Sequence, residues 1–215
     1  MQLTSINIGR EQPIANGKKT GTSGIYKEPQ DGPVRIGALG LADDAVIDTD
    51  NHGGVDQAVY LYGEPDYAWW SAHLGQPLTA GTFGENLTIA GLESSACAIG
   101  DRFAIGTVLL EVTAPRIPCT TLNARMGDVT FVKRFRVAER PGLYCRVLIP
   151  GVLTVGMPVA YQTASGAHIP IVEALQFFYE RTRHDVPTIR RFLAAPIDIR
   201  SRRELTAEYL ALTAD

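Results

Sequence analysis

The sequence predicts an α+β fold: a β-strand-rich body with a closed or strongly curved sheet, followed by a small helical module. Up to about residue 163, short runs rich in Val, Ile, Leu and Tyr alternate with Gly and Pro, which is typical of strands and turns. Few helical patterns interrupt these runs, which does not fit a regular alternation of strands and helices. From Gly166 the glycine-rich pattern stops, and apolar residues recur at helical spacing. We therefore place a β-rich domain at residues 1–166 and a three-helix module at residues 167–215.

The strands are predicted where a short apolar run is bounded by turn residues. Six segments meet this condition: residues 3–8, 34–39, 58–62, 108–113, 143–149 and 152–161. Two helical segments lie between them. The first covers residues 65–74, with Pro65 in its first turn and Gly75 as its stop. The second covers residues 120–137 and is broken near Gly127.

Three short helices are predicted in the C-terminal module. Pro187 is well placed at the start of the second helix. Residues 201–204 read Ser-Arg-Arg-Glu, which fits a capping box that opens the third helix. The predicted ranges are residues 171–182, 188–194 and 201–212. The module could cover a cleft, dock a redox partner or form a homodimer, and the sequence leaves these roles open.

The composition is that of a globular protein. The 215 residues are 45% hydrophobic and 20% charged, which excludes disorder, collagen and coiled coil. The formal net charge is −3, so we expect no nucleic acid partner. No apolar run approaches the roughly 20 residues of a membrane span, and residues 1–5 do not resemble a secretory signal. We therefore expect no membrane partner and a cytoplasmic location.

Polar residues lie in three Gly- and Pro-rich turns beside apolar strands, where rigid folds usually hold ligand groups. In the first turn, His52 precedes Gly53 and Gly54, whose bare backbone lets a ligand approach closely. This histidine could contact phosphate, move a proton or simply hold the turn. In the second turn, Asn86 could read the edge of a heterocycle or satisfy a buried turn. The three turns are residues 52–58, 83–87 and 115–123.

Cys119 is the strongest single candidate for chemistry. It follows a Pro-flanked loop that contains Arg116, and it precedes an expected helix start at Thr120. A helix N-terminus and a nearby cation both favour the thiolate, which makes a nucleophile or a soft-metal ligand. The alternative is a buried, small apolar side chain. Cys97 and Cys145 lack this context and are expected to be packed, and no CxxC spacing indicates a disulfide framework or a Cys-rich zinc site.

Taken in order, these segments resemble a known family. The series resembles the MOSC domain, the molybdenum cofactor sulfurase C-terminal type, and within it the stand-alone bacterial YiiM-like group. Any one of the motifs is weak, whereas the ordered series is specific and spans nearly the whole chain. The motifs are residues 22–27 (TSGIYK), 40–44 (GLADD), 52–54 (HGG), 83–88 (FGENLT), 115–119 (PRIPC) and 142–147 (GLYCRV).

The resemblance implies a barrel-like, β-rich core that binds a pyranopterin molybdenum cofactor in a cleft, with Cys119 as the molybdenum ligand. Related enzymes reduce N-hydroxylated compounds, so it implies an oxidoreductase that takes a small-molecule N-hydroxylated substrate. No flavin or iron–sulfur motif is evident, so electrons would come from a separate electron-donor protein. His52 and Asn86 are then expected at the pterin or the substrate, and Gly53 and Gly54 beside the cofactor.

Arginine forks match phosphate oxygens, and 16 of the 20 basic residues are arginine. We expect Arg116, Arg35 and Arg140 at the cofactor phosphate, with Lys27 as a further candidate. Gln57 stands where the family commonly has a basic residue, which removes one possible contact.

Two other functions fit the same residues. The first is a carrier that holds the molybdenum cofactor, or transfers sulfur through a Cys119 persulfide, without turning over a substrate. The second is a binding or structural domain whose motifs keep the body folded. No lysine context supports a Schiff base, so pyridoxal phosphate is not expected.

Overall fold

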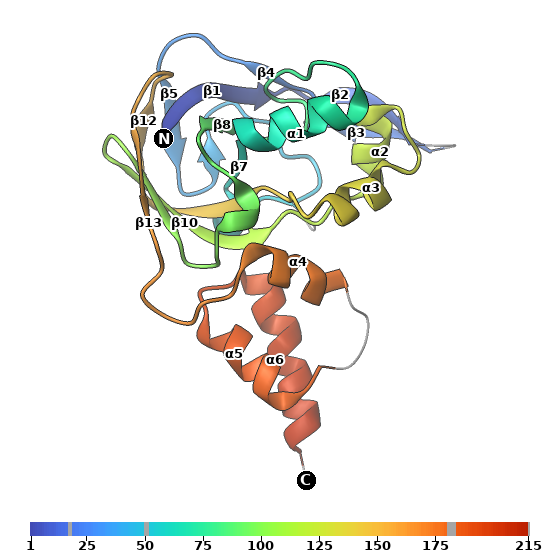
Figure 1. Ribbon diagram of the computed structural model, residues 1–215, viewed down its shortest axis with the longest axis vertical. Coiled ribbons are helices and arrows are strands. Elements are labelled where there is room, and N and C mark those ends of the chain that lie inside the picture. The colour runs from blue at the N-terminus through green and yellow to red at the C-terminus, as the bar shows by residue number, and fades with distance from the viewer. Residues whose placement is uncertain (17–18, 50–51, 180–183, 215) are drawn as a thin grey trace.

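The body of the molecule is built on one eight-stranded sheet (Figure 1). The computed structural model describes residues 1–16, 19–49, 52–179 and 184–214. Apolar side chains of these strands meet in one core, which explains why the short Val-, Ile- and Leu-rich runs form strands. In spatial order the strands are β13 (Val159–Gln162), β9 (Arg102–Ile105), β10 (Val108–Pro115), β11 (Leu143–Ile149), β7 (Val59–Gly63), β8 (Leu87–Ala90), β1 (Gln2–Gly9) and β4 (Lys27–Pro29).

The sheet curls so that β1, the strand next to its β4 edge, comes back to β13 at the opposite edge. Leu3 N–H on β1 donates to the Met157 carbonyl oxygen at 3.0 Å, just before β13. Val159 N–H on β13 donates to the Met1 carbonyl oxygen at 3.1 Å. Strands β7 and β8 run parallel, whereas the other paired strands of this sheet run antiparallel. The strongly curved sheet of the predicted α+β fold is confirmed.

Two small sheets complete the body. One contains β12 (Gly151–Leu153), β5 (Val34–Gly37) and β6 (Gly40–Leu41), and the other pairs β2 (Gln12–Asn16) with β3 (Lys19–Ser23). The continuous strand predicted at residues 152–161 is therefore wrong, because a turn at residues 154–158 separates β12 from β13. Short 3₁₀ helices η1 (Val55–Gln57) and η2 (Ser94–Ala96) interrupt the loops.

Three helices of the body pack around an aromatic cluster that includes Trp70 and Phe135. The helices are α1 (Glu64–Leu74), α2 (Thr120–Met126) and α3 (Phe131–Ala138). Gly75 and Gly127 adopt the left-handed conformation directly after α1 and α2, which confirms the predicted stop and the predicted break.

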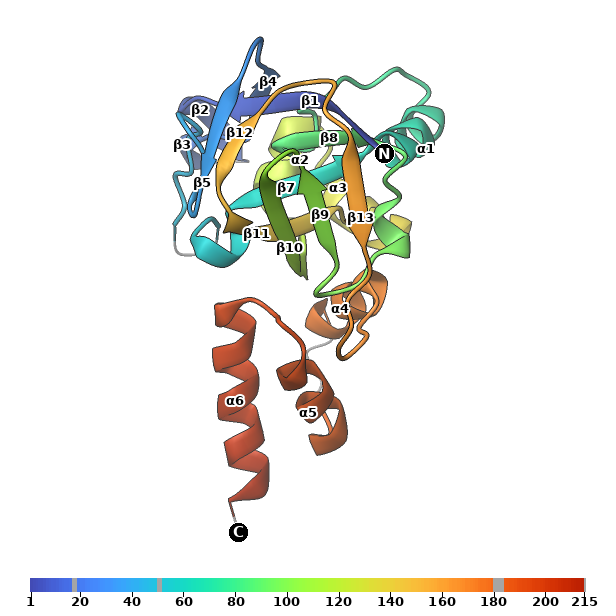
Figure 2. The same cartoon turned by 90° about the vertical axis from the view of Figure 1, so that its left-hand side faces the viewer.

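The C-terminal module contains α4 (Ile171–Tyr179), α5 (Val186–Ala194) and α6 (Ile199–Thr213), and Figure 2 shows α6 running away from the body. The predicted capping box at residues 201–204 is wrong. The Asp198 carboxylate caps α6 instead, by accepting from the N–H groups of Arg200 at 3.0 Å and Ser201 at 3.1 Å. The predicted end of the first helix, residues 180–182, lies outside the described residues.

The module is not isolated from the sheet. Its buried residues, among them Ile171, Phe192 and Leu205, belong to the same apolar core as the strands. None of the helices in the described ranges is long and apolar enough to cross a membrane.

Candidate functional site

The three polar turns meet at one cavity of about 500 Å³. Segments that precede β7 and β8 and a segment that follows β10 contribute to its wall, together with residues 22–27 and 44–48. The cavity therefore gathers residues that are far apart in the sequence. The predicted site residues that line it are Lys27, His52, Gly53, Asn86, Arg116 and Cys119.

Cys119 lies in the cavity wall as the residue that precedes α2. Burial on its own would raise the pKa of the thiol, but a hydrogen bond with His52 and the charge of Arg116 oppose it. A hydrogen bond with the Thr121 side chain acts in the same direction, and together these contacts lower the pKa to about 6. Cys119 is therefore mainly a thiolate at neutral pH, which is the form that binds metals and attacks electrophiles.

His52 reaches Cys119 from a loop shaped by two glycines. Gly53 and Gly54 both have positive φ angles, 70° and 79°, a backbone conformation that other residues rarely adopt. A Cβ atom on Gly53 would also lie 2.8 Å from a methyl group of Val46. The Gly-Gly pair thus permits the path that the backbone takes immediately after His52.

Arg116 is buried in the same wall, with 4% of its surface exposed. Its guanidinium carbon lies 5.5 Å from the ring centre of Tyr60 and 5.6 Å from that of Phe135. The guanidinium also hydrogen-bonds the phenol of Tyr144. However, its Nη1 has no hydrogen-bond partner, and no carboxylate of the described residues neutralises the charge. The Cys119 thiolate is the negative charge that acts on this guanidinium. Because Nη1 still lacks an acceptor, the arrangement suits a further anionic ligand.

Asn86 is held by the protein on every side of its amide. The Oδ1 atom accepts from the Tyr60 N–H at 3.1 Å, and Nδ2 donates to the Asn7 carbonyl at 3.4 Å and to Asp44 Oδ2 at 2.8 Å. Asp44 in turn binds the Lys27 ammonium at 2.6 Å. Burial lowers the pKa of Lys27, while the Asp44 carboxylate opposes this effect. Asn86 therefore orients an Asp44–Lys27 pair that faces the cavity.

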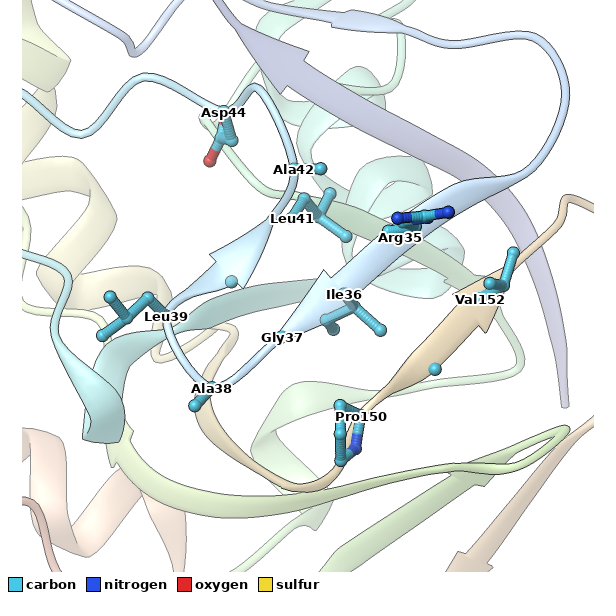
Figure 3. A pocket seen from close by; sticks show the side chains of 12 residues that line it. Arg35, Ile36, Gly37, Ala38, Leu39, Leu41, Ala42, Asp44, Pro150 and Val152 are labelled. Carbon is cyan, nitrogen blue, oxygen red and sulfur yellow. The ribbon is translucent and has the colours of Figure 1, made fainter.

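Three predicted cofactor contacts do not line this cavity. Arg140 pairs with the fully buried Asp66 at 2.6 Å, and Gly54 is exposed. Arg35 is exposed on β5 beside a larger, open hollow of about 900 Å³ (Figure 3). Of the described residues around that hollow, Arg35 and Asp44 carry charge, and the rest are mainly aliphatic or glycine.

The other two cysteines are buried in the core, which agrees with the packing role expected for them. Burial raises the pKa of Cys97 to about 12 and that of Cys145 well above its ordinary value. Both thiols are therefore protonated at neutral pH.

The sequence analysis did not single out Asp44 or Tyr144, although both line the cavity. Asp44 is the last residue of the GLADD segment, so a motif did mark its position. Tyr144 belongs to the GLYCRV segment, so a motif marked its position as well, but no local pattern connects it to Arg116.

The side chains of the cavity suit a cofactor that already supplies most of the ligands of its own metal ion. Within the described residues, no three His, Cys, Asp or Glu side chains are grouped to hold a metal ion. The cavity offers instead one thiolate, one guanidinium nitrogen without a hydrogen-bond partner and, at Gln57 Oε1, a buried acceptor without a partner. A pterin cofactor with a phosphate tail would use all three, so the residues present fit that group.

Residues 48–160 match the MOSC domain family. Protein YflK of Bacillus subtilis is 37% identical over 155 residues, which cover 72% of this chain and 70% of that protein. A protein of Gibberella moniliformis named "Reductase" is 37% identical over 153 residues, which cover 69% of this chain but 27% of that longer protein. The crystal structure of YiiM from Geobacillus stearothermophilus superposes with a TM-score of 0.78 at 27% identity. That superposition covers 97% of this chain and 98% of the other.

Proposed function

The chain belongs to the MOSC domain family, and from this membership we propose that it is a molybdenum-cofactor-dependent oxidoreductase that reduces N-hydroxylated compounds. MOSC domains are associated with molybdenum cofactor binding in general. The name of the fungal relative supports a reductase activity, although it describes a protein of which the match spans 27%. The likeness to the YiiM structure supports a stand-alone protein of this type.

One observation carries the proposal: a thiol of low pKa and a buried guanidinium with an unbonded nitrogen and no carboxylate partner line the same cavity. The thiolate of Cys119 is the soft ligand that molybdenum prefers, and it is available at neutral pH. Arg116 supplies the fork that binds the phosphate of the cofactor. A structural domain would have no need to keep both groups at the wall of a cavity.

The side chains of the cavity wall would hold the cofactor and supply protons to the substrate. His52 hydrogen-bonds Cys119 and keeps the sulfur in its charged form. The Asp44–Lys27 pair, held by Asn86, is a hydrogen-bonded acid and base at the cavity wall and suits the movement of protons to a substrate. When bound, the cofactor supplies the two-electron redox chemistry.

The reaction balances as follows. Conversion of an N–OH group to N–H consumes two electrons and two protons and releases water. The electrons come from a separate electron-donor protein, because the chain has no recognisable flavin or iron–sulfur motif. The protons come from water through the polar groups of the cavity wall.

The proposal is tested with protein from a molybdenum-competent host whose metal content has been confirmed. Given an artificial reductant, the wild type should reduce an N-hydroxylated purine or a hydroxylamine to the amine. The Cys119→Ser variant is the control and should show no turnover. If loaded wild type equals this control on every substrate, the oxidoreductase proposal fails.

The carrier function uses the same thiol and has its own outcome. In a carrier, the Cys119 thiolate would attack the outer sulfur of a donor persulfide and release the donor thiolate. The resulting Cys119 persulfide would pass this sulfur to an acceptor without reducing an N-hydroxylated substrate. Transfer of labelled sulfur from Cys119 together with absent reduction would favour this function.

A further inference from the structure

The start of α6 holds the loop that carries His52. The Arg200 guanidinium donates through Nη2 to the carbonyl oxygen of Thr49 at 3.0 Å. The same atom lies 3.4 Å from the carbonyl oxygens of His52 and of Gly53, to which it also donates. One side chain of the helical module therefore binds three backbone groups of this loop.

A second connection fixes the other end of the loop. Ile199 N–H, in the first turn of α6, donates to Asp56 Oδ2 in η1 at 2.8 Å. The other oxygen of Asp56 lies 3.0 Å from Arg146 Nε on β11, and the Thr113 hydroxyl on β10 donates to the Asp56 carbonyl. The segment that contains His52 is thus held between the sheet and α6.

The position of Arg200 is itself fixed. Asp198, which is 3% exposed, accepts from the Arg200 N–H at 3.0 Å and caps the helix. Arg200 also lies near the cavity wall: burial raises the pKa of Tyr144, and the positive charge of Arg200 opposes that effect. Tyr144 is a lining residue.

The loop needs such an anchor because Gly53 and Gly54 restrict their own backbone so little. Glycine loses more conformational freedom on folding than any other residue, so a Gly-Gly loop is ordered only when other groups bind it. Backbone carbonyls are the groups that such a loop offers, and a guanidinium with several donors can bind more than one of them.

We propose that Arg200 is a positioning residue of the cavity: by binding the carbonyls of Thr49, His52 and Gly53, it holds the His52 side chain against Cys119. The helical module is then part of the site. The inference concerns the geometry of the cavity and holds for a reductase and for a carrier alike.

The test uses the full chain without cofactor and reads the ring nitrogens of His52 by nuclear magnetic resonance at one pH. The His52→Ala spectrum assigns the signal, and Cys119→Ser defines the ring without its sulfur partner. Arg200→Ala should shift the His52 signals towards those of Cys119→Ser. Arg203→Ala, which changes an exposed arginine of the same helix, is the matched control and should leave them unchanged.

Two further results decide the proposal. Arg200→Lys keeps several hydrogen-bond donors and should retain most of the wild-type signal of the His52 ring. This variant takes the place of Arg200→Ala if the alanine variant does not fold. Wild-type His52 signals in a folded Arg200→Ala protein would overturn the proposal. Loss of the wild-type signal in Arg203→Ala as well would overturn it too, because the effect would then be general to the helix.

A second readout uses protein made in a molybdenum-competent host. Arg200→Ala and His52→Ala should each lower the retained molybdenum, by roughly tenfold, as expected for a lost charge-assisted hydrogen bond. The double variant should lose no more than the larger single loss, because both changes remove one contact. Multiplying losses would contradict the proposal. If wild type itself retains no molybdenum, the proposed function fails, while the ring measurement still decides the role of Arg200.

Discussion

Two cysteines of the molecule lie in surroundings of opposite electrostatics. In the cavity, Cys119 lies near Arg116 and His52, and the pKa of its thiol is lowered to about 6. In the second site, Cys97 lies near the carboxylates of Asp101, Asp66 and Glu93. Burial, reinforced by these acids, raises its pKa to about 12.

The difference lies in what neutralises the arginine. Asp66 and Glu93, two of the acids that act on Cys97, bind Arg140 at 2.6 Å and 3.3 Å, so the charge of this arginine is already satisfied by the protein. Arg116 has no such carboxylate among the described residues and keeps a buried nitrogen unbonded. An arginine therefore marks a site for an anionic ligand only when no carboxylate of the fold neutralises it.

The two thiols should differ most in reactivity. At pH 7 the thiolate fraction of Cys119 should exceed that of Cys97 by roughly four to five orders of magnitude, given these pKa values. Alkylation by iodoacetamide, followed by mass spectrometry across a pH series, should therefore modify Cys119 first, with a midpoint near pH 6. Equal labelling of the two cysteines in the folded chain would show that their thiol pKa values do not differ.

Changing the two arginines should produce opposite phenotypes. Arg116→Met removes a buried cation that has no carboxylate partner, so it should lower molybdenum retention by tenfold or more. It also removes one of the charges that hold Cys119 as a thiolate, so it should change the unfolding free energy, but by less than Arg140→Met does. Arg140→Met leaves the fully buried Asp66 without its cation and should cost about 3 kcal/mol of stability, with retention unchanged. Urea unfolding and metal analysis of both variants check this prediction. Matching phenotypes would show that the two sites do not differ as described.

The lowered pKa of Cys119 also predicts a pH-dependent stability. The folded protein holds the thiolate below the ordinary pKa of 9.0, so the stabilisation is complete above pH 9 and is lost as pH falls towards 6. The difference in unfolding free energy between wild type and Cys119→Ser should therefore increase by roughly 2 to 4 kcal/mol from pH 6 to pH 9. Urea titrations of the protein without cofactor measure it. A difference that stays flat with pH would mean that the thiol is not perturbed.

The smallest effect is expected at the open hollow. Arg35 is exposed there and does not line the cysteine cavity. Arg35→Ala should change the unfolding free energy by less than about 0.5 kcal/mol and leave molybdenum retention at the wild-type level. A marked loss of retention would place the cofactor phosphate at the hollow rather than at Arg116.

Local patterns predicted much of the fold. The strand at residues 143–149 and the break at Gly127 were correct because each depends on a short apolar run or on one left-handed residue. The β2–β3 hairpin was missed because its strands are polar and short. The cap of α6 was assigned to the wrong residue because Asp198 and Ser201 are both good N-caps, and tertiary packing decided between them.

The site was predictable only in part. The turn chemistry around Cys119 and His52 marked the residues that meet in the cavity. The sequence could not show that a carboxylate neutralises Arg140 but not Arg116, because the partner of Arg140 is Asp66, 74 positions away along the chain. The Asp44–Asn86 hydrogen bond joins residues that are 42 positions apart, and no local sequence pattern predicts it.

The molybdenum content of the purified protein shows directly whether the cavity holds a molybdenum cofactor through Cys119. Wild type, Cys119→Ser and Cys145→Ser would be purified from a molybdenum-competent host and their metal measured per chain by elemental analysis. The account predicts that wild type and Cys145→Ser retain molybdenum and that Cys119→Ser retains none. Equal molybdenum in Cys119→Ser and wild type would contradict it.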